Sequence, residues 1–293
     1  MHRRKIFHIK LRSDTLVLGK RTLVMGVLNV TPDSFSDGGK FFDFSSAVDH
    51  ALAMQRAGAD LLDIGAESTR PGAADIGAAE ELRRLLPVLK GLRKRLKIPI
   101  SVDTRRAIVA EAAIAAGAQL LNDISGLTFE PQLAKVAARH RVPLILMHMR
   151  GTPATMQKKP FARNVLRDVA CGLRKSIAIA RKAGVAKSQL ILDPGIGFGK
   201  SFAQNYELLT GLPELAELGY PLLVGTSRKA FLGATLARNS KPAPAEQRLW
   251  ATAATVTASI LGGAHIVRVH DLAEMAQVAR TADCLLDPRY LHR

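Results

Sequence analysis

The chain has 293 residues, of which 47% are hydrophobic, and this is enough for one large core. Its two cysteines provide neither a disulfide framework nor a zinc site, so we expect a reducing, cytoplasmic location. The net charge is +17, but the basic residues are spread over predicted helix faces and aromatic residues make up only 5%, which argues against a nucleic-acid partner. No apolar run approaches the roughly 18 residues of a membrane span, so no membrane partner is expected either.

Short apolar runs alternate with helical patterns along the chain. A hairpin is predicted over 6–19, so we treat 1–22 as an N-terminal cap and 23–293 as one domain. The run V-M-G-V-L-N-V at 24–30 lacks alternation and predicts a buried strand. The other predicted strands span 61–65, 98–102, 119–123, 142–149, 189–193, 220–225 and 264–270. The predicted helices span 45–57, 78–96, 104–116, 131–141, 161–183, 201–218 and 246–261, and a last helix follows Asp271.

Eight strand–helix pairs in succession predict one fold class. Strands that alternate with helices pair in parallel through right-handed crossovers. Eight such units close a (β/α)8 TIM barrel of about 250 residues, here with a short N-terminal β-hairpin cap. A doubly wound open sheet is less favoured, because no G-x-G-x-x-G loop follows the first strand.

Polar residues end nearly every predicted strand. In a TIM barrel the C-terminal strand ends converge on the face that carries the active site, so we predict a single polar site there. Thr104 and Asp271 are interpreted as helix N-caps, and His148 as either structural or part of the site. The strand-end residues are Asn29, the loop Glu67 to Arg70, Asp103, Asn122, His148, Asp193, Ser227 to Lys229, Arg268 and His270.

The types of these residues indicate a ligand with two parts. Asp103, Asn122 and Asp193 end apolar strands, and a buried carboxylate needs hydrogen-bond donors. A flat heterocycle with ring N–H and amino groups would supply them. No Ser-His-Asp or Cys-His pairing is evident. The sequence therefore predicts a heterocycle pocket that works without a nucleophilic dyad.

An anion pocket is predicted beside it. Arginine is suited to forked contacts with phosphate oxygens. Asn29, together with phosphate oxygens, can hold Mg²⁺, which keeps several waters and uses few protein ligands. The residues that suggest the anion pocket are Arg70, Arg268, His270 and the P-G-I-G-F-G turn at 194–199.

Eight motifs in succession resemble those of the dihydropteroate synthases, the pterin-binding enzymes of folate biosynthesis. They cover almost the whole chain from residue 23. The matching segments are MGVLNVTPDSFSDGG (25–39), GAESTRPG (65–72), SVDT (101–104), NDISG (122–126), HMRGTPATMQ (148–157), LDPGIGFGK (192–200), GTSRKAFLG (225–233) and RVHD (268–271).

The resemblance implies a TIM-barrel transferase that joins 6-hydroxymethyl-7,8-dihydropterin diphosphate to 4-aminobenzoate and releases diphosphate. It implies Mg²⁺, a homodimer formed through late helices that include 246–261, and loops after Asn29 and Glu67 that close over the site. The implied catalytic residues are Asp103, Lys229 and Arg268. The implied pterin contacts are Asp103, Asn122, Asp193, Lys229 and Arg268. The implied diphosphate contacts are Asn29 (with the metal), Thr69, Arg70, Arg268 and His270, and the implied aminobenzoate contacts are Phe35, Thr69, Pro71, Phe198 and Ser227.

Two other functions share part of this pattern. A pterin-dependent methyltransferase that serves a corrinoid protein would use the same barrel, but it would not need the anion pocket. A catalytically silent pterin-binding paralogue is the second alternative, and the intact polar residues argue against it. One departure from the family is Ala230, where many relatives carry Ser or Arg, so the aminobenzoate carboxylate must find backbone N–H groups or bind more weakly. This leaves the sulfonamide response open.

Overall fold

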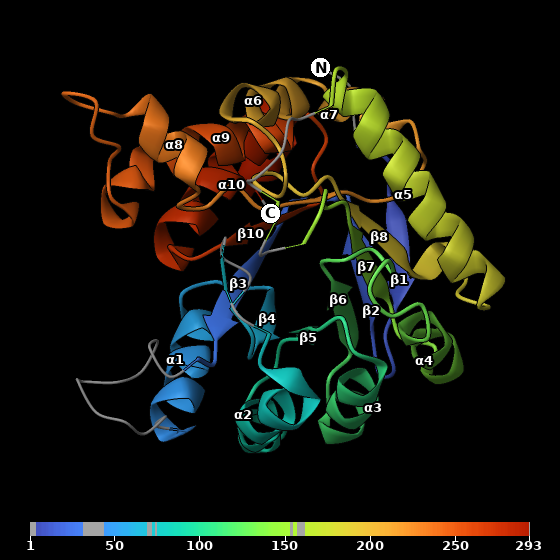
Figure 1. Cartoon of the computed structure of the whole chain (residues 1–293). Helices are drawn as coiled ribbons and strands as arrows, with labels where there is room; N and C mark the ends of the chain where they lie inside the picture. The colour runs from blue at the N-terminus through green and yellow to red at the C-terminus, as the bar shows by residue number, and fades with distance from the viewer. Residues whose placement is uncertain are drawn as a thin grey trace.

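Eight parallel strands form the centre of the molecule, with helices around them (Figure 1). The structure is a computed structural model, and it describes residues 4–31, 44–68, 72–73, 75–152, 155–156 and 162–292. The barrel strands are β3 Leu23–Asn29, β4 Leu61–Gly65, β5 Ile100–Asp103, β6 Leu120–Asp123, β7 Leu144–Met147, β8 Leu190–Asp193, β9 Leu223–Val224 and β10 Ile266–Val269.

The strands follow the order β8-β7-β6-β5-β4-β3-β10-β9, and all the pairs are parallel. A parallel bridge between Leu192 and Leu222 joins the two ends of this order. The sheet is therefore a barrel, as the alternation of strands and helices predicted, and the open doubly wound sheet is excluded. Several strands are shorter than the apolar runs that predicted them: the run at 220–225 supplies only two strand residues.

Helices follow the strands and cover the outside of the barrel (Figure 1). No helix among the described residues combines the length and apolarity needed to span a membrane. The α-helices are α1 Phe44–Arg56, α2 Gly77–Leu92, α3 Ala107–Ala116, α4 Leu133–His140, α5 Val165–Lys182, α6 Phe202–Thr210, α7 Leu212–Ala216, α8 Ala230–Thr235, α9 Leu249–Leu261 and α10 Leu272–Leu286; the 3-10 turns are η2 Lys187–Gln189, η3 Ala245–Arg248 and η4 Pro288–His292.

The predicted helix over 201–218 is in fact two helices. Gly211 ends α6, and α7 begins directly after it, with a proline in its first turn. A Cβ on Gly211 would lie 2.3 Å from a methyl carbon of Leu166 on α5. A larger side chain at this position would displace the Leu166 side chain, so glycine suits the close approach of α5.

The turn before α3 also differs from the prediction. The helix begins at Ala107 rather than at Thr104, and Arg106 occupies the N-cap position. Thr104 Oγ1 instead accepts a 3.2 Å hydrogen bond from Arg106 N. Asp271 does occupy the N-cap position of α10, but its carboxylate accepts from Arg228 Nε at 3.0 Å and makes no capping bond.

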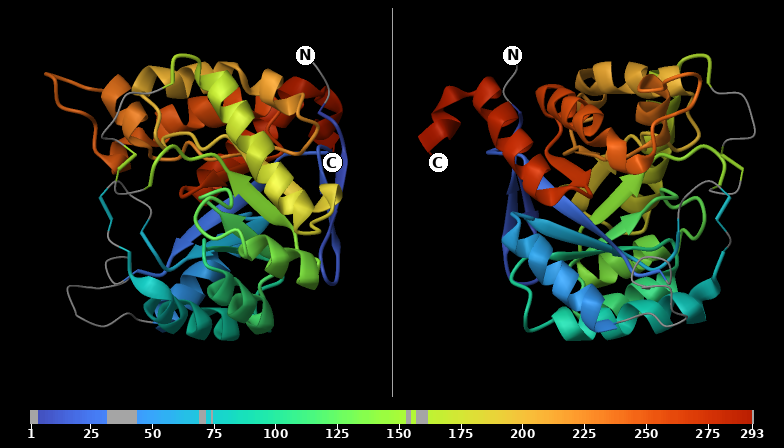
Figure 2. Two further views of the ribbon diagram at one scale, coloured as in Figure 1. Left: turned by 45° about the vertical axis from the view of Figure 1, so that its right-hand side comes forward. Right: turned by 90° about the vertical axis from the view of Figure 1, so that its left-hand side faces the viewer.

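An N-terminal hairpin, β1 Phe7–Lys10 and β2 Thr15–Leu18, lies at one end of the barrel (Figure 2). Its apolar side chains join a buried cluster with residues from the barrel interior. Just before β1, Arg4 reaches α10 and pairs with Asp283 at 2.5 Å. The hairpin members of the cluster are Ile9, Leu11 and Leu18, and the barrel members are Leu23, Met25, Leu61, Leu120, Ile145, Ile191, Leu223 and Ile266. The hairpin thus fills the N-terminal end of the barrel and leaves the C-terminal strand ends for the polar site.

Candidate active site

The register of the four neighbouring strands β3, β4, β5 and β6 places polar residues at the same height along the barrel axis. Asn29 at the end of β3 pairs with Gly65, Gly65 pairs with Asp103, and Asp103 pairs with Asn122. Side chains two residues apart point to the same face of a strand. A Cβ on Gly65 would lie 3.4 Å from the Asp103 Cβ, so the glycine leaves the space beside Asp103 open. The predicted strand-end residues of β3, β5 and β6 therefore do lie together.

Asp63 on β4 lies at the centre of the site, and the sequence analysis missed it. It is fully buried, and its Oδ2 accepts from Asn122 Nδ2 at 2.9 Å and from Arg268 Nε at 2.7 Å. A signal was present in the sequence: Asp63 is the charged residue inside the apolar run L-L-D-I-G, two positions before Gly65. The alternation of the strand places it on the same face as Gly65, inside the barrel.

Arg268 on β10 joins two carboxylates. It contacts Asp63 through Nε and Asp103 Oδ2 through Nη2, the latter at 3.3 Å. Burial and the neighbouring charge of Asp63 raise the pKa of Asp103 well above its ordinary value, while Arg268 opposes this rise. Burial alone would lower the pKa of Arg268, but the charges of Asp63 and Asp103 outweigh it and raise that pKa. Arg268 is thus held as a cation between the two acids.

Three buried polar atoms inside the barrel have no hydrogen-bond partner in the part of the chain that the structure describes: Asp63 Oδ1, Ser101 Oγ and Asn122 Oδ1. Because Asn122 Nδ2 donates to Asp63, the carbonyl oxygen of this amide is left as an acceptor. Buried polar groups in native proteins are paired as a rule. These atoms therefore fit a polar ligand that carries N–H donors.

Asp193 and Lys229 meet on the other side of the barrel, around the turn that follows β8. Asp193 Oδ1 accepts from Gly195 N at 2.7 Å, and burial raises the pKa of this carboxyl. Lys229 Nζ donates to Ile196 O and lies 4.6 Å from the centroid of the Phe198 ring. Burial lowers the pKa of Lys229 to about 8. Asp193 and Lys229, both predicted to contact the pterin, therefore form one group with Phe198, which was predicted to contact the aminobenzoate.

In the turn at 194–199, which was predicted to contribute to an anion pocket, two backbone N–H groups are occupied within the protein. The N–H of Gly195 is used by Asp193, and the N–H of Gly197 donates to Asn205 Oδ1 at 2.6 Å. Gly197 has a φ of +86°, and a Cβ there would lie 2.9 Å from Lys229 Cδ. The glycines thus serve a tight turn that carries a backbone carbonyl to Lys229.

Ser227 and His270 lie in contact, although they were predicted for different substrates. Ser227 Oγ lies 3.0 Å from His270 Nδ1 and 3.2 Å from His270 N. His270 is an exposed residue, but desolvation of its ring and the charges of Arg268 and Arg228 lower its pKa to about 4. At neutral pH, His270 is therefore uncharged, and the positive charge in this part of the site comes from Arg268.

The side chain of His148, whose role was left open, is largely buried, and its Nδ1 has no hydrogen-bond partner among the described residues. Its imidazole packs against α5, where a Cβ on Gly172 would lie 2.4 Å from His148 Cδ2. Burial lowers its pKa to about 3. Its backbone carbonyl accepts from Lys200 Nζ at 2.8 Å. Lys200 also donates to the carbonyls of Pro194 and Gly195, so this buried lysine ties the turn after β8 to the end of β7.

Four predicted substrate residues, Phe35, Thr69, Arg70 and Pro71, lie outside the described residues, as does the Gly38-Gly39 loop. Asn29 is described, and it is half-buried at the end of β3. Within the described ranges, no three His, Cys, Asp or Glu residues gather as metal ligands. The donor set suits a hard cation such as Mg²⁺ only where a substrate's phosphate oxygens and water complete the shell around the Asn29 oxygen.

Comparisons with known proteins agree with this geometry. The family model described as "Pterin binding enzyme" matches residues 25–270. A dihydropteroate synthase of Synechocystis sp. is 52% identical over 267 residues, which cover 91% of each chain. A dihydropteroate synthase of Xanthomonas albilineans, solved with 4-aminobenzoic acid, has a TM-score of 0.89 and 41% identity and covers 97% of this chain and 99% of its own. The same enzyme in complex with 7,8-dihydropteroate has a TM-score of 0.85 and 38% identity and covers 96% of this chain and 99% of its own. The chain therefore belongs to the family of pterin-binding enzymes and, within it, to the dihydropteroate synthases.

Proposed function

We propose that this chain condenses 6-hydroxymethyl-7,8-dihydropterin diphosphate with 4-aminobenzoate to give 7,8-dihydropteroate and diphosphate. The observation that carries the proposal is the buried cluster of Asp63, Asp103, Asn122 and Arg268 at the C-terminal strand ends. Its free acceptor atoms fit the ring and amino N–H groups of a pterin. The relatives at high identity are transferases of this kind.

The pterin occupies the barrel mouth in this proposal. Asn122 Oδ1 and the carboxylates of Asp103 and Asp193 accept from pterin N–H groups. Lys229 donates from the opposite side, because its ammonium group already lies between the turn after β8 and Phe198. Arg268 is fixed by two carboxylates and therefore flanks the ring with little freedom to move away. In this proposal the reactive CH₂ group lies near Asp103, at the C-terminal end of β5.

The reaction breaks the C–O bond between the pterin CH₂ and the diphosphate, whose oxygen keeps the electron pair. The aminobenzoate nitrogen then forms the new C–N bond and loses a proton. The positive charge on the pterin favours the ionised form of Asp103, which stabilises it through space. When bound, Mg²⁺ supplies charge stabilisation for the departing diphosphate. Asn29 would hold the metal, and Arg268 and His270 would contact the phosphate oxygens, His270 as a neutral hydrogen-bond donor.

The function is tested by the release of diphosphate from purified protein with the pterin diphosphate, Mg²⁺ and 4-aminobenzoate. We expect formation of dihydropteroate that depends on the arylamine, and the absence of such product refutes the proposal. Asp103→Asn is expected to fold normally and to lower turnover by roughly 100-fold or more, the usual effect of removing one group that stabilises transition-state charge. Asp49→Asn, which alters an exposed ion pair with Arg95, is the matched control.

We further propose that the protein is a homodimer formed through α9 and α10. Trp250 on α9 is 80% exposed and Leu285 on α10 is 57% exposed, and the two helices pack side by side. Large exposed apolar groups on adjacent helices favour contact with a second copy. Sedimentation velocity should give a dimer for the native chain and a monomer for Trp250→Lys. A native chain that is monomeric at assay concentration contradicts the proposal.

We also propose a cytoplasmic location. Cys171 and Cys284 are both free thiols, and Cys171 is exposed. Free thiols of this kind persist in a reducing compartment. Fractionation of cells with an antibody against the chain tests this location, and recovery of the protein outside the cytoplasm contradicts it.

A further inference from the structure

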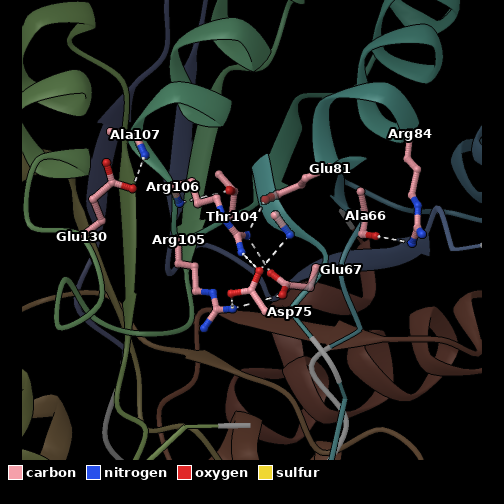
Figure 3. Close-up of polar contacts among 11 residues, drawn as sticks. Ala66, Glu67, Asp75, Glu81, Arg84, Thr104, Arg105, Arg106, Ala107 and Glu130 are labelled. Atoms are coloured by element: carbon pink, nitrogen blue, oxygen red, sulfur yellow. Dashed lines mark hydrogen bonds and ion pairs between the residues drawn. The ribbon is translucent and has the colours of Figure 1, made fainter. Parts of the chain in front are cut away.

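A buried carboxylate on α2 has no part in the reaction as described above. Glu81 is 1% exposed, and its Oε2 lies 2.7 Å from Nη1 of Arg106, which occupies the N-cap position of α3 and is 6% exposed. Burial raises the pKa of Glu81, although the hydroxyl of Thr104 and the charge of Arg106 oppose this rise. Figure 3 shows the three side chains together. Since a buried ion pair often contributes little net stability, this pair calls for another role.

Carboxylates from separate segments hold the guanidinium of Arg106. Besides Glu81, Glu67 Oε2 after β4 lies 2.9 Å from Arg106 Nη1, and Asp75 before α2 accepts from Arg106 Nη2 (Figure 3). The guanidinium also lies 5.6 Å from the centroid of the Phe129 ring, after β6. Moving away from such partners would leave buried charges without compensation, which is strongly unfavourable. The contacts therefore hold Arg106, its backbone included, in one position.

The backbone of Arg106 in turn holds the residue that follows Asp103. Arg106 N donates to Thr104 Oγ1 at 3.2 Å, which leaves the hydroxyl proton of Thr104 for the Glu81 carboxylate. Thr104 N donates to Asn122 O at 3.0 Å and so continues the pairing of β5 with β6 beyond Asp103. Thr104 is itself buried. The turn from Thr104 to Arg106 is therefore fixed at the point where β5 delivers Asp103 to the site.

The carboxylate of Asp103 has little else to hold it. Among the described residues, its one ion-pair or hydrogen-bond contact is with Arg268 Nη2, at 3.3 Å. Burial and the charges of Asp63 and Glu81 raise its pKa, so these two neighbours repel the ionised carboxylate rather than draw it into place. The position of Asp103 therefore depends on its backbone, which strand β5 fixes on one side and the turn from Thr104 on the other.

We propose that Arg106, anchored by Glu81, is a positioning residue for Asp103 and acts through Thr104. The inference rests on the proposed function, in which the Asp103 carboxylate stabilises the positive charge that forms on the pterin. A group that acts in the transition state must be held in its productive geometry, and a displacement of about 1 Å can cost roughly 100-fold in rate. The proposal therefore predicts a loss of turnover that exceeds any loss of affinity for the pterin, because the other predicted pterin contacts are unchanged.

Three variants weaken this support and leave Asp103 itself unchanged. Arg106→Lys keeps the positive charge but lacks the planar fork that contacts several carboxylates at once. Glu81→Met keeps the length of the side chain and removes its charge and its acceptors. Thr104→Val removes the hydroxyl that accepts from Arg106 N and leaves every ion pair in place, and Thr104→Ser restores the hydroxyl. Glu80→Gln, which alters a surface ion pair with Arg83 on the same helix, is the matched control.

For each protein, kcat is measured with the pterin diphosphate and 4-aminobenzoate, and Kd is measured by calorimetry for the 6-hydroxymethylpterin alcohol. We expect the three variants to lower kcat by roughly tenfold or more and to change Kd for the alcohol by less than about threefold. Thr104→Ser and Glu80→Gln should stay near the native values. Thermal unfolding checks that each variant is folded, and Thr104→Val keeps the test decisive if a charge variant does not fold.

Combination with Asp103→Asn shows whether the support acts through Asp103. Residues that act through one another have non-additive effects, so Arg106→Lys should lower the kcat of the Asp103→Asn protein by less than about twofold. A full loss in that background, an unchanged kcat in the folded single variants, or an equal loss of affinity for the alcohol overturns the proposal. Native protein without arylamine-dependent product defeats the proposed function instead, so the two failures can be told apart.

Discussion

Asp63 determines how two other side chains of the site lie. Its Oδ2 accepts from Asn122 and from Arg268, so a single buried oxygen sets both the amide orientation and the position of the guanidinium. Its charge also contributes to the raised pKa of Asp103. An acid that touches three groups of the site, directly or through its charge, influences binding even where it makes no contact with the substrate.

Asp63→Asn should therefore weaken binding of the pterin alcohol. Hydrogen bonds to charged groups contribute about 1.5–3 kcal/mol each, so we expect Kd to rise by roughly 10- to 100-fold. Because the charge of Asp63 is removed, the pKa of Asp103 should fall towards its ordinary value, and the pH dependence of binding should shift to lower pH. Calorimetry over a range of pH measures both effects.

The matched control for this change is Asp60→Asn, at the start of the same strand. Asp60 accepts from Arg21 Nη1 and Val24 N, each at 2.8 Å, near the opposite end of the barrel. The Asp60→Asn substitution should alter the stability of the protein and leave its affinity for the pterin unchanged. If Asp63→Asn binds the pterin as tightly as the control does, Asp63 has no positioning role.

Among the elements, the turn between β8 and α6 depends on one buried lysine. Lys200 Nζ donates to the carbonyls of His148, Pro194 and Gly195 at 2.8–3.0 Å. Burial lowers the pKa of Lys200 well below its ordinary value. Three acceptors nevertheless require three N–H groups, which only the ammonium form has. The lysine thus holds a turn whose carbonyl at Ile196 accepts from Lys229.

Lys200→Met should loosen this turn. The carbonyls of His148 and Pro194 lose their lysine donor, whereas the Gly195 carbonyl keeps Phe198 N; at about 1–3 kcal/mol for each lost partner, the melting temperature should fall by several degrees or more. KM for the pterin diphosphate should rise as well, because Lys229 loses its fixed acceptor. Lys182→Met, at the exposed end of α5, is the control for loss of charge. If the Lys200→Met protein is destabilised but its KM is unchanged, Lys200 contributes to stability and not to substrate binding.

For the helices and strands, the sequence predicts the existence of each element well. It predicts less well where the element ends and which other elements it contacts. Apolar runs without alternation locate all eight strands, because both faces of a barrel strand are buried. The break at Gly211 escapes prediction because the helical pattern continues through it into α7. The inward direction of Asp63 depends on strand register, and the partners of Arg106 lie on separate elements. Contacts between distant segments are what local patterns leave undetermined.

For the molecule as a whole, His265 joins the N-terminal segment to the barrel. His265 Nδ1 accepts from Leu222 N at 3.2 Å, and its Nε2 lies 3.0 Å from Lys5 O. With the carbonyl as an acceptor, Nε2 carries the proton, so the ring is the neutral tautomer. Burial lowers the pKa of His265 to about 4. Protonation would remove the acceptor for Leu222 N and place a charge in the interior.

The stability of the fold should therefore decrease in acid. The unfolded histidine binds a proton near its ordinary pKa of about 6.5, and the folded one does so only near 4, so the contribution of His265 is complete above pH 6.5 and is lost as the pH falls towards 4. The loss is about 1.4 kcal/mol per pH unit, or about 3 kcal/mol in all. His148, which is also buried, acts in the same direction.

The buried carboxyls with raised pKa values act in the opposite direction, so the effect of His265 is isolated by comparison with a variant. In His265→Asn, the side-chain oxygen can still accept from Leu222 N but does not titrate. Denaturant unfolding at several values of pH from 7.5 to 4.5 should give a flatter dependence for this variant than for the native chain. Parallel curves would show that His265 does not control acid stability.

The hairpin that fills the N-terminal end of the barrel determines how substrates and products can reach the polar interior. Because Ile9, Leu11 and Leu18 pack into that end, the C-terminal strand ends form the one entrance to the polar interior in the part of the chain that the structure describes. Both reactants then bind, and both products dissociate, through this same face of the barrel. Closing one end of the barrel thus confines exchange with solvent to the face that carries the polar strand ends.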